Sequence, residues 1–144
     1  NPDAVIIRTS WVYSSYGKNF VKTILRLLQE KPSVSVVNDQ IGSPTYAADL
    51  ARAILEIVSA KNWKSGIYNF SNEGIISWFD FAKAIAHLQK STTPVHPIST
   101  AQFPTPAKRP AWSVLDKSKI TSTYGVKIRP WKAALKDCLE LLNK

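Results

Sequence analysis

The sequence has too few cysteines, histidines and glycines for several common kinds of functional site. Its 144 residues include one cysteine, two histidines and five glycines. Cys138 has no partner for a disulfide within the chain, and together with His87 and His96 it is too little for a zinc centre. No glycines have the spacing of the phosphate-binding patterns G-x-G-x-x-G or G-x-x-x-x-G-K-[ST]. The sequence therefore predicts no metal site and no dinucleotide loop.

Catalytic patterns and long hydrophobic runs are missing as well. None of the five tyrosines has a lysine four residues later, and there is no G-x-S-x-G elbow. We therefore expect no catalytic residue in this chain. The apolar runs are far shorter than the ~20 residues of a membrane span, and no signal peptide is apparent. Together with the lone cysteine, this predicts a cytoplasmic protein with no membrane partner.

The positive charge is large but spread out. The net charge is +9, from 19 Lys and Arg against 10 Asp and Glu. No block of five or more basic residues occurs, and no aromatic RNA-binding box is present. The pattern favours a solvated basic surface first and a phosphorylated small ligand second. Nucleic acid is not expected as a partner.

Hydrophobic periodicity predicts strands that alternate with helices. Apolar runs predict strands at residues 4–9, 34–37 and 66–70. Helical spacing of apolar positions predicts helices at residues 20–30, 47–59, 77–87 and 130–142. The predicted inner face of the second helix comprises Leu50, Ile54, Ile57 and Val58. This alternation predicts an α/β fold.

The first predicted strand, AVIIRT at residues 4–9, is typical of a strand buried on both faces of a sheet. The sequence opens almost directly on this run, although such a strand needs a neighbour on each side. We therefore expect the chain to be the second half of a larger protein. Residues 91–114 hold five of the nine prolines and are expected to be extended or looped.

Two candidate binding residues follow the first strand. Trp11 lies just beyond it, where ligands bind in open α/β sheets, and its ring can form a flat wall against a sugar. A core position is the alternative for Trp11. Asn19 precedes the first helix and is either its N-cap or an amide that contacts a ligand.

Two more candidates, Gln40 and Ser43, stand where the second strand leads into the second helix. Gly42 and Pro44 turn the chain there, and Ser43 or Thr45 can cap the helix. Gln40 has no such structural role, which makes it the better candidate for ligand contact.

A fifth candidate, Arg109, lies in a loop that Pro106 and Pro110 stiffen. Its planar guanidinium fits phosphate oxygens, and a stiff loop loses less entropy on binding. A solvated basic loop is the alternative for Arg109 and its neighbour Lys108.

Four stretches, taken in order, carry a family resemblance. They are RTSWVYSSYGKNFVKTIL (8–25), VVNDQIGSPTYAADLARAI (36–54), GIYNFSNEGIISWFDFAKAIA (66–86) and PAKRPAWSVLDKSKI (106–120). Together they closely resemble the C-terminal half of dTDP-4-dehydrorhamnose reductases, which are extended short-chain dehydrogenases/reductases. The resemblance covers residues 3–142, nearly the whole chain.

The resemblance implies the C-terminal part of a Rossmann-like fold, with a few sheet strands and a small mixed α/β substrate-binding subdomain. It implies that residues 1–144 are the substrate-binding half of an enzyme that reduces dTDP-4-dehydro-L-rhamnose to dTDP-L-rhamnose for surface polysaccharides. NADPH or NADH is the implied reductant of the full-length protein. In this family the cofactor loop and the catalytic Tyr and Lys belong to the N-terminal half. This chain alone is therefore expected to bind no cofactor and to be inactive.

The resemblance also bears on individual residues. It places Trp11 in the sugar pocket, Gln40 and Ser43 near the dTDP-sugar, and Arg109 on the substrate side. Some family members hold a divalent metal between glutamates at a dimer interface. Glu140 could serve as one such Glu, but Ala48 stands where another is expected. We therefore predict no metal, and a homodimer stays possible.

Two other functions stay open at this point. The chain also resembles the regulatory β subunit of methionine adenosyltransferase, which is a binding protein rather than an enzyme. A nucleotide-sugar epimerase or dehydratase of the extended short-chain class is the third candidate.

Overall fold

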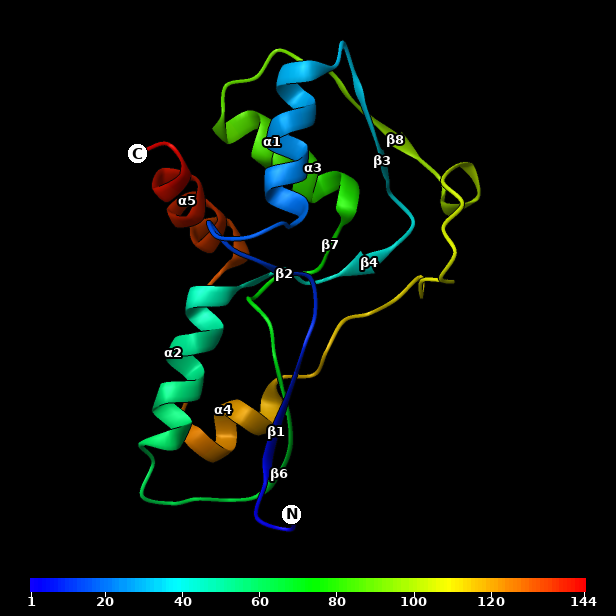
Figure 1. Cartoon of the computed structure of the whole chain (residues 1–144). Coiled ribbons are helices and arrows are strands. Elements are labelled where there is room, and N and C mark those ends of the chain that lie inside the picture. Colours follow the sequence, from blue (N-terminus) through cyan, green and yellow to red (C-terminus); the bar gives the residue numbers. More distant parts are fainter.

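The chain folds into two lobes that meet near its middle (Figure 1). The computed structural model describes residues 1–144. The upper lobe in Figure 1 contains α1 (Phe20–Glu30), β3 (Val34–Val37), α3 (Trp78–Leu88), β8 (Val95–Ile98) and α5 (Trp131–Leu142). The lower lobe contains β1 (Val5–Thr9), α2 (Ala47–Val58), β6 (Gly66–Phe70) and α4 (Ser118–Tyr124). The predicted α/β class is confirmed.

Four two-stranded pairs organise the backbone. Three are parallel: β1 with β6, β3 with β8, and β2 (Val12–Tyr13) with β5 (Thr45–Tyr46). The fourth, β4 (Ile41–Gly42) with β7 (Ile76–Ser77), is antiparallel. In the β1–β6 pair Val5 is opposite Gly66 and Thr9 is opposite Phe70. Both strands therefore end together, at the junction of the lobes.

The main core lies in the upper lobe, where the apolar stripes of three helices meet. Helix α1 buries Val21, Ile24 and Leu28 against α3 and β3. Phe81 of α3 is fully buried and contacts aromatic rings on three sides: Tyr13, Phe20 and Trp131. Cys138 is buried on α5, and its burial raises the pKa of the thiol to about 11. The predicted helices of this lobe are confirmed.

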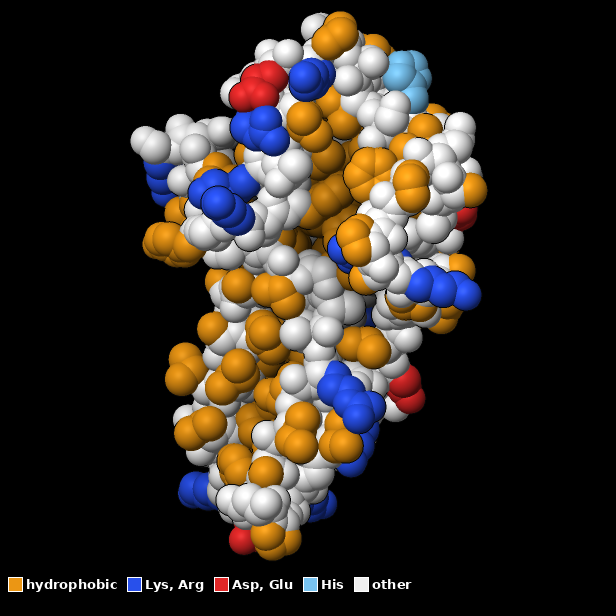
Figure 2. Space-filling model, turned by 45° about the vertical axis from the view of Figure 1, so that its right-hand side comes forward, with side chains coloured by type: hydrophobic (Ala, Val, Ile, Leu, Met, Phe, Trp, Pro, Cys, Tyr) orange, Lys and Arg blue, Asp and Glu red, His pale blue; other side chains and the backbone are white.

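The lower lobe has a smaller core, and two predictions about it were wrong. Strand β1 packs on one face only, because α2 and α4 cover only that face of the β1–β6 pair; on the other face Ile6 and Ile67 are 52% and 44% exposed. Helix α2 turns Ala53 and Ile57 inward, whereas Ile54 and Val58 are exposed. Figure 2 shows the resulting hydrophobic side chains spread over the lower lobe.

Local capping follows the sequence at two helices but not at the third. Asn19 Oδ1 accepts from Lys22 N, and Ser77 and Asp80 form a capping box at the start of α3, which is the S-x-x-D pattern of the sequence. Helix α2 begins after Tyr46 without a side-chain cap, so the prediction of Ser43 or Thr45 as its cap was wrong. Ser43 and Thr45 bond elsewhere: Thr45 shares a hydrogen bond with Thr9.

The proline-rich segment contains a strand that the sequence did not predict. β8 pairs with β3 in parallel, with Val34 opposite Val95 and Val37 opposite Ile98. Both strands of a two-stranded sheet are edge strands, and an edge strand tolerates a proline such as Pro97. A short 3₁₀ turn, η1 (Thr100–Gln102), follows. Among all the helices, none combines the length and hydropathy that crossing a bilayer requires.

Candidate functional site

A largely apolar groove of about 390 Å³ lies in the upper lobe. Helix α1 and the first residue of α3 supply one wall, β3 supplies the floor, and the loop after η1 supplies the other wall. Figure 2 shows hydrophobic side chains gathered in a hollow of this lobe. The lining side chains that matter most are Phe20, Leu27, Trp78 and Phe103 on the apolar side and Gln40, Thr105 and Arg109 on the polar side.

Trp11 joins this groove through an aromatic stack. Its ring lies on that of Trp78, with centroids 3.7 Å apart and planes 14° apart, and Trp78 also contacts Phe20 at 4.5 Å. A Cβ at Gly42 would stand 2.6 Å from the Trp11 ring, so only a glycine at this position leaves enough room for the ring. Trp11 also has a φ of 49°, which is rare for a residue with a side chain. Residues with such strained backbone conformations cluster at active and ligand-binding sites.

Gln40 and Arg109 both line the groove. Gln40 is buried, with its backbone between β3 and β4, and its Nε2 donates to Thr100 Oγ1 at 3.1 Å. Gln40 thus neither turns the chain nor caps a helix, but it does link this segment to Thr100. Arg109 is exposed, and its guanidinium makes no ion pair within the chain. It is therefore free to pair with an anion.

Asn19 and Ser43 do not line the groove, and their polar atoms are engaged within the chain. Asn19 Nδ2 donates to Ser14 O at 2.7 Å and to Tyr16 O at 3.3 Å, while Oδ1 caps α1. Ser43 is fully buried, and its hydroxyl donates to Gly74 O at 2.6 Å. Gln40 and Arg109 thus share the groove and Trp11 stacks behind its Trp78, while Asn19 and Ser43 support the segments beside them.

The sequence patterns missed two groove residues, Phe20 and Trp78, because they also fit a core stripe. Each is the first residue of its helix and is only half-buried. An aromatic residue directly after an N-cap, as in Asn19-Phe20 and Ser77-Trp78, is the signal that points to the rim. Trp112, two residues after the loop that carries Arg109, is 61% exposed.

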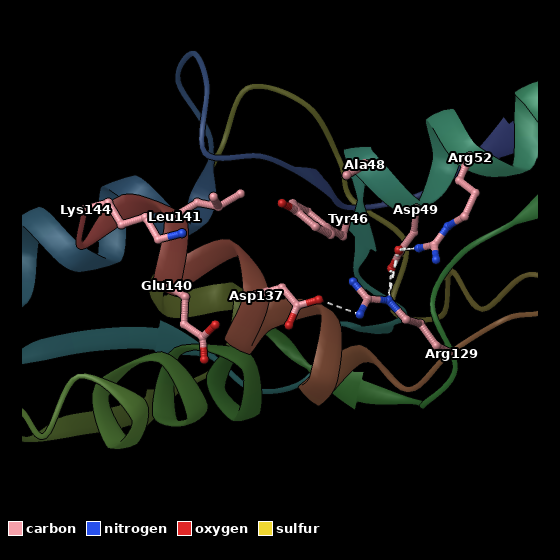
Figure 3. Close-up of a pocket in the computed structure, with 9 residues that line it drawn as sticks. All are labelled: Tyr46, Ala48, Asp49, Arg52, Arg129, Asp137, Glu140, Leu141 and Lys144. Atoms are coloured by element: carbon pink, nitrogen blue, oxygen red, sulfur yellow. Dashed lines mark hydrogen bonds and ion pairs between the residues drawn. The ribbon is translucent and has the colours of Figure 1, made fainter.

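A second, charged pocket of about 430 Å³ lies between α2 and α5 (Figure 3). Asp49 is almost fully buried there and accepts from Arg129 Nε at 2.8 and 2.9 Å and from Arg52. Arg129 also donates to Asp137 at 2.6 Å. These hydrogen bonds to carboxylates raise the pKa of Arg129, which stays charged. The charges neutralise one another, so this pocket joins the two lobes rather than presenting a free charge.

Ala48 and Glu140, the two positions considered for a metal, also line this charged pocket. No group of three or more His, Cys, Asp or Glu side chains in the chain is placed to hold a metal ion. The absence of a metal stays a prediction.

The starts of α1, α2 and α3 do not suit the pyrophosphate of a dinucleotide. Pyrophosphate binding needs free backbone N–H groups at a helix start and glycines that let the phosphates approach. The starts of α1 and α3 are capped by Asn19 and by Ser77 with Asp80. Helix α2 carries the carboxylate of Asp49 in its first turn, which disfavours an anion.

An aromatic-walled groove with one free arginine, on an α/β scaffold, is typical of a ligand-binding domain. The family model described as the RmlD substrate binding domain matches residues 1–144. The chain belongs to this family.

Individual relatives agree with that assignment. The dTDP-4-dehydrorhamnose reductase of Aggregatibacter actinomycetemcomitans is 43% identical over 95% of this chain and 50% of its own length. The crystal structure of the Clostridium acetobutylicum dTDP-4-dehydrorhamnose reductase matches with a TM-score of 0.94 and 42% identity, covering all of this chain and 50% of that one. The Bacillus anthracis enzyme, solved in complex with NADP, matches with a TM-score of 0.88 and 39% identity, over 95% of this chain and 48% of that one. The family resemblance and the fold expected from it are confirmed, and the chain spans about half the length of these relatives.

Proposed function

We propose that residues 1–144 are the dTDP-sugar-binding half of a dTDP-4-dehydrorhamnose reductase, and that the apolar groove with its aromatic rim holds the nucleotide sugar. The observation that carries this proposal is that Gln40 and Arg109 line one groove, and that Trp11 stacks on Trp78 in its aromatic rim. The relatives that match this chain are reductases of this name. The substrate is dTDP-4-dehydro-L-rhamnose and the product is dTDP-L-rhamnose.

Each part of such a ligand has a suitable surface. The flat faces of a base or sugar stack on aromatic rings, and Trp78 and Phe20 present such rings along the groove. The diphosphate suits the free guanidinium of Arg109, which can bond two oxygens at once. The amide of Gln40 has acceptor capacity left for a base or sugar hydroxyl. Trp11 stacks on Trp78 and extends the aromatic rim toward the sugar in this proposal.

Asn19 and Ser43 support the site from behind in this proposal. The amide of Asn19 closes the loop that leads to Phe20, and the hydroxyl of Ser43 ties the turn after Gln40 to Gly74. A direct ligand contact by either side chain would replace one of these hydrogen bonds. We expect such contacts to be secondary to those of Arg109 and Trp11.

The reduction itself requires groups that this chain does not supply. In the full-length protein the hydride comes from NADPH or NADH, held by an N-terminal half with the catalytic Tyr and Lys. The capped helix starts support this division of labour. Residues 1–144 bind and orient the sugar nucleotide and are inactive alone. A cytoplasmic location and a homodimer are parts of the same proposal that rest on the family resemblance.

The family match favours a reductase over the two alternatives. A regulatory subunit like that of methionine adenosyltransferase would need no sugar-nucleotide affinity. An epimerase or dehydratase would bind a sugar nucleotide but release a different product. Product analysis of the full-length protein with dTDP-4-dehydro-L-rhamnose and NADPH separates all three.

Calorimetric titration of this chain with dTDP tests the binding proposal. Arg109→Ala is expected to weaken dTDP binding about tenfold, because it removes a charge-assisted hydrogen bond worth about 1.5 kcal/mol or more. Lys108→Ala is the matched control, since Lys108 is equally exposed in the same loop but does not line the groove. NADPH should give no saturable heat. Equal losses for both variants, or saturable NADPH binding, would contradict the proposal.

A further inference from the structure

The proline-rich loop 103–110 is held at both ends by one short segment, residues 39–41. Every residue of this loop is exposed, yet Phe103, Thr105 and Arg109 line the groove. At the end of the loop, Ile41 N donates to Ala111 O at 2.8 Å and Ser113 N donates to Ile41 O at 2.8 Å. The loop therefore has little packing of its own, and its position depends on its two attachments.

The attachment at the start of the loop is a cluster of hydrogen bonds around Thr100. The carboxylate of Asp39 accepts from Thr100 N at 2.9 and 3.0 Å and from Thr100 Oγ1 at 2.7 Å. Gln40 Nε2 donates to the same hydroxyl at 3.1 Å. The hydrogen bonds from the side chain and backbone of Thr100 hold the pKa of Asp39 below its usual value. One threonine thus links η1 to two residues between β3 and β4.

We propose that Asp39 is a positioning residue for the groove: by holding Thr100 it fixes the start of loop 103–110 and thereby sets Arg109 at the rim. We call the hydrogen bonds between Asp39 and Thr100 the Asp39–Thr100 latch. The latch rests on these hydrogen bonds alone, whereas the identity of the ligand rests on the proposed function. Asp39 touches no groove surface itself and does not line the groove. Its effect on a ligand therefore passes through Thr100, which leads to the loop and also bonds Gln40.

Limited trypsin digestion measures the latch without any ligand. The loop contains one good tryptic site, after Lys108, because Pro110 protects the bond after Arg109. Asp39→Ala and Thr100→Val are each expected to speed cleavage after Lys108 about fivefold, because each removes hydrogen bonds that oppose local opening. Thr100→Ser keeps both donors and should restore the wild-type rate. The cleaved bond is identified by mass spectrometry.

Asp116→Ala is the matched control. Asp116 is an exposed aspartate that accepts from Ser118 N at 2.8 Å, as Asp39 accepts from Thr100 N, but it lies outside the groove and its loop. Its variant should be cleaved after Lys108 at the wild-type rate. Circular dichroism verifies that each variant is folded. If Asp39→Ala does not fold, Thr100→Val serves as the test.

Titration with dTDP then links the latch to binding. Asp39→Ala and Thr100→Val should each weaken dTDP binding by a factor close to that of Arg109→Ala. The double variant Asp39→Ala/Thr100→Val should bind dTDP no more weakly than either single variant. Unchanged cleavage after Lys108 in both latch variants would overturn the latch, whatever the ligand. If wild-type protein does not bind dTDP, the proposed function fails while the cleavage rates still decide the latch. Faster cleavage with unchanged dTDP affinity would overturn the positioning role.

Discussion

Replacing Asp49 with alanine is expected to lower the free energy of unfolding by about 3 kcal/mol, because it removes a buried acceptor and leaves the partly buried Arg129 with Asp137 as its one remaining carboxylate partner. The Asp49 side chain is 3% exposed and accepts from Arg129, Arg52 and, at 2.7 Å, from Asn72. Asn72 in turn accepts from Tyr46 N at the start of α2. The substitution therefore removes the centre of the network that joins the lobes.

Urea denaturation measures this loss, and Arg26→Ala provides the control. The Arg26–Glu30 ion pair has a similar N–O distance, 2.7 Å, but both side chains are more than half exposed. Its removal should cost less than about 0.5 kcal/mol. If Asp49→Ala costs no more than Arg26→Ala, the charged network does not hold the lobes together.

Gly74→Ala is expected to destabilise the protein by about 3 kcal/mol, from backbone strain and overpacking together. Gly74 has a φ of +129°, which side-chain-bearing residues rarely adopt. A Cβ there would stand 2.7 Å from Nε1 of Trp131 and nearer still to Cδ1. Trp131 is buried against Phe81, so its ring has no free space to enter.

Gly17→Ala separates the two causes. Gly17 also has a positive φ, +66°, but a Cβ there meets nothing within 4 Å. Its substitution should cost only the backbone strain, about 1 kcal/mol. Thermal or urea unfolding of both variants gives the difference, and equal losses would show that Trp131 moves aside without cost.

The helices of the upper lobe were predictable because their signals are local. The stripe of α1 and the Ser77–Asp80 capping box each lie within one or two turns of sequence. The inner face of α2 was not predictable, because apolar residues lie on two sides of that helix. Ile57 and Ile54 differ in burial only because β6 and α4 cover one side.

The candidate site was predictable residue by residue but not as an arrangement. Residue chemistry and family resemblance singled out Trp11, Gln40 and Arg109; in the structure Gln40 and Arg109 line one groove, and Trp11 stacks on the groove residue Trp78. The partner of Gln40 is Thr100, 60 residues away, and no local pattern announces such a contact. Asp39 and Thr100 are 61 residues apart, so no local pattern predicted the Asp39–Thr100 latch either. Side-chain roles that depend on long-range pairing are therefore what the sequence alone leaves open.

The indole N–H signals of the tryptophans test the central proposal, dTDP binding at the aromatic rim, most directly. Each signal can be assigned by a Trp→Phe variant in ¹H–¹⁵N spectra. At saturating dTDP, the signals of Trp11 and Trp78 are expected to shift. Those of Trp63, which donates to Asp3 O in the lower lobe, and of buried Trp131 should stay. Unchanged Trp11 and Trp78 signals at saturating dTDP would contradict the proposal.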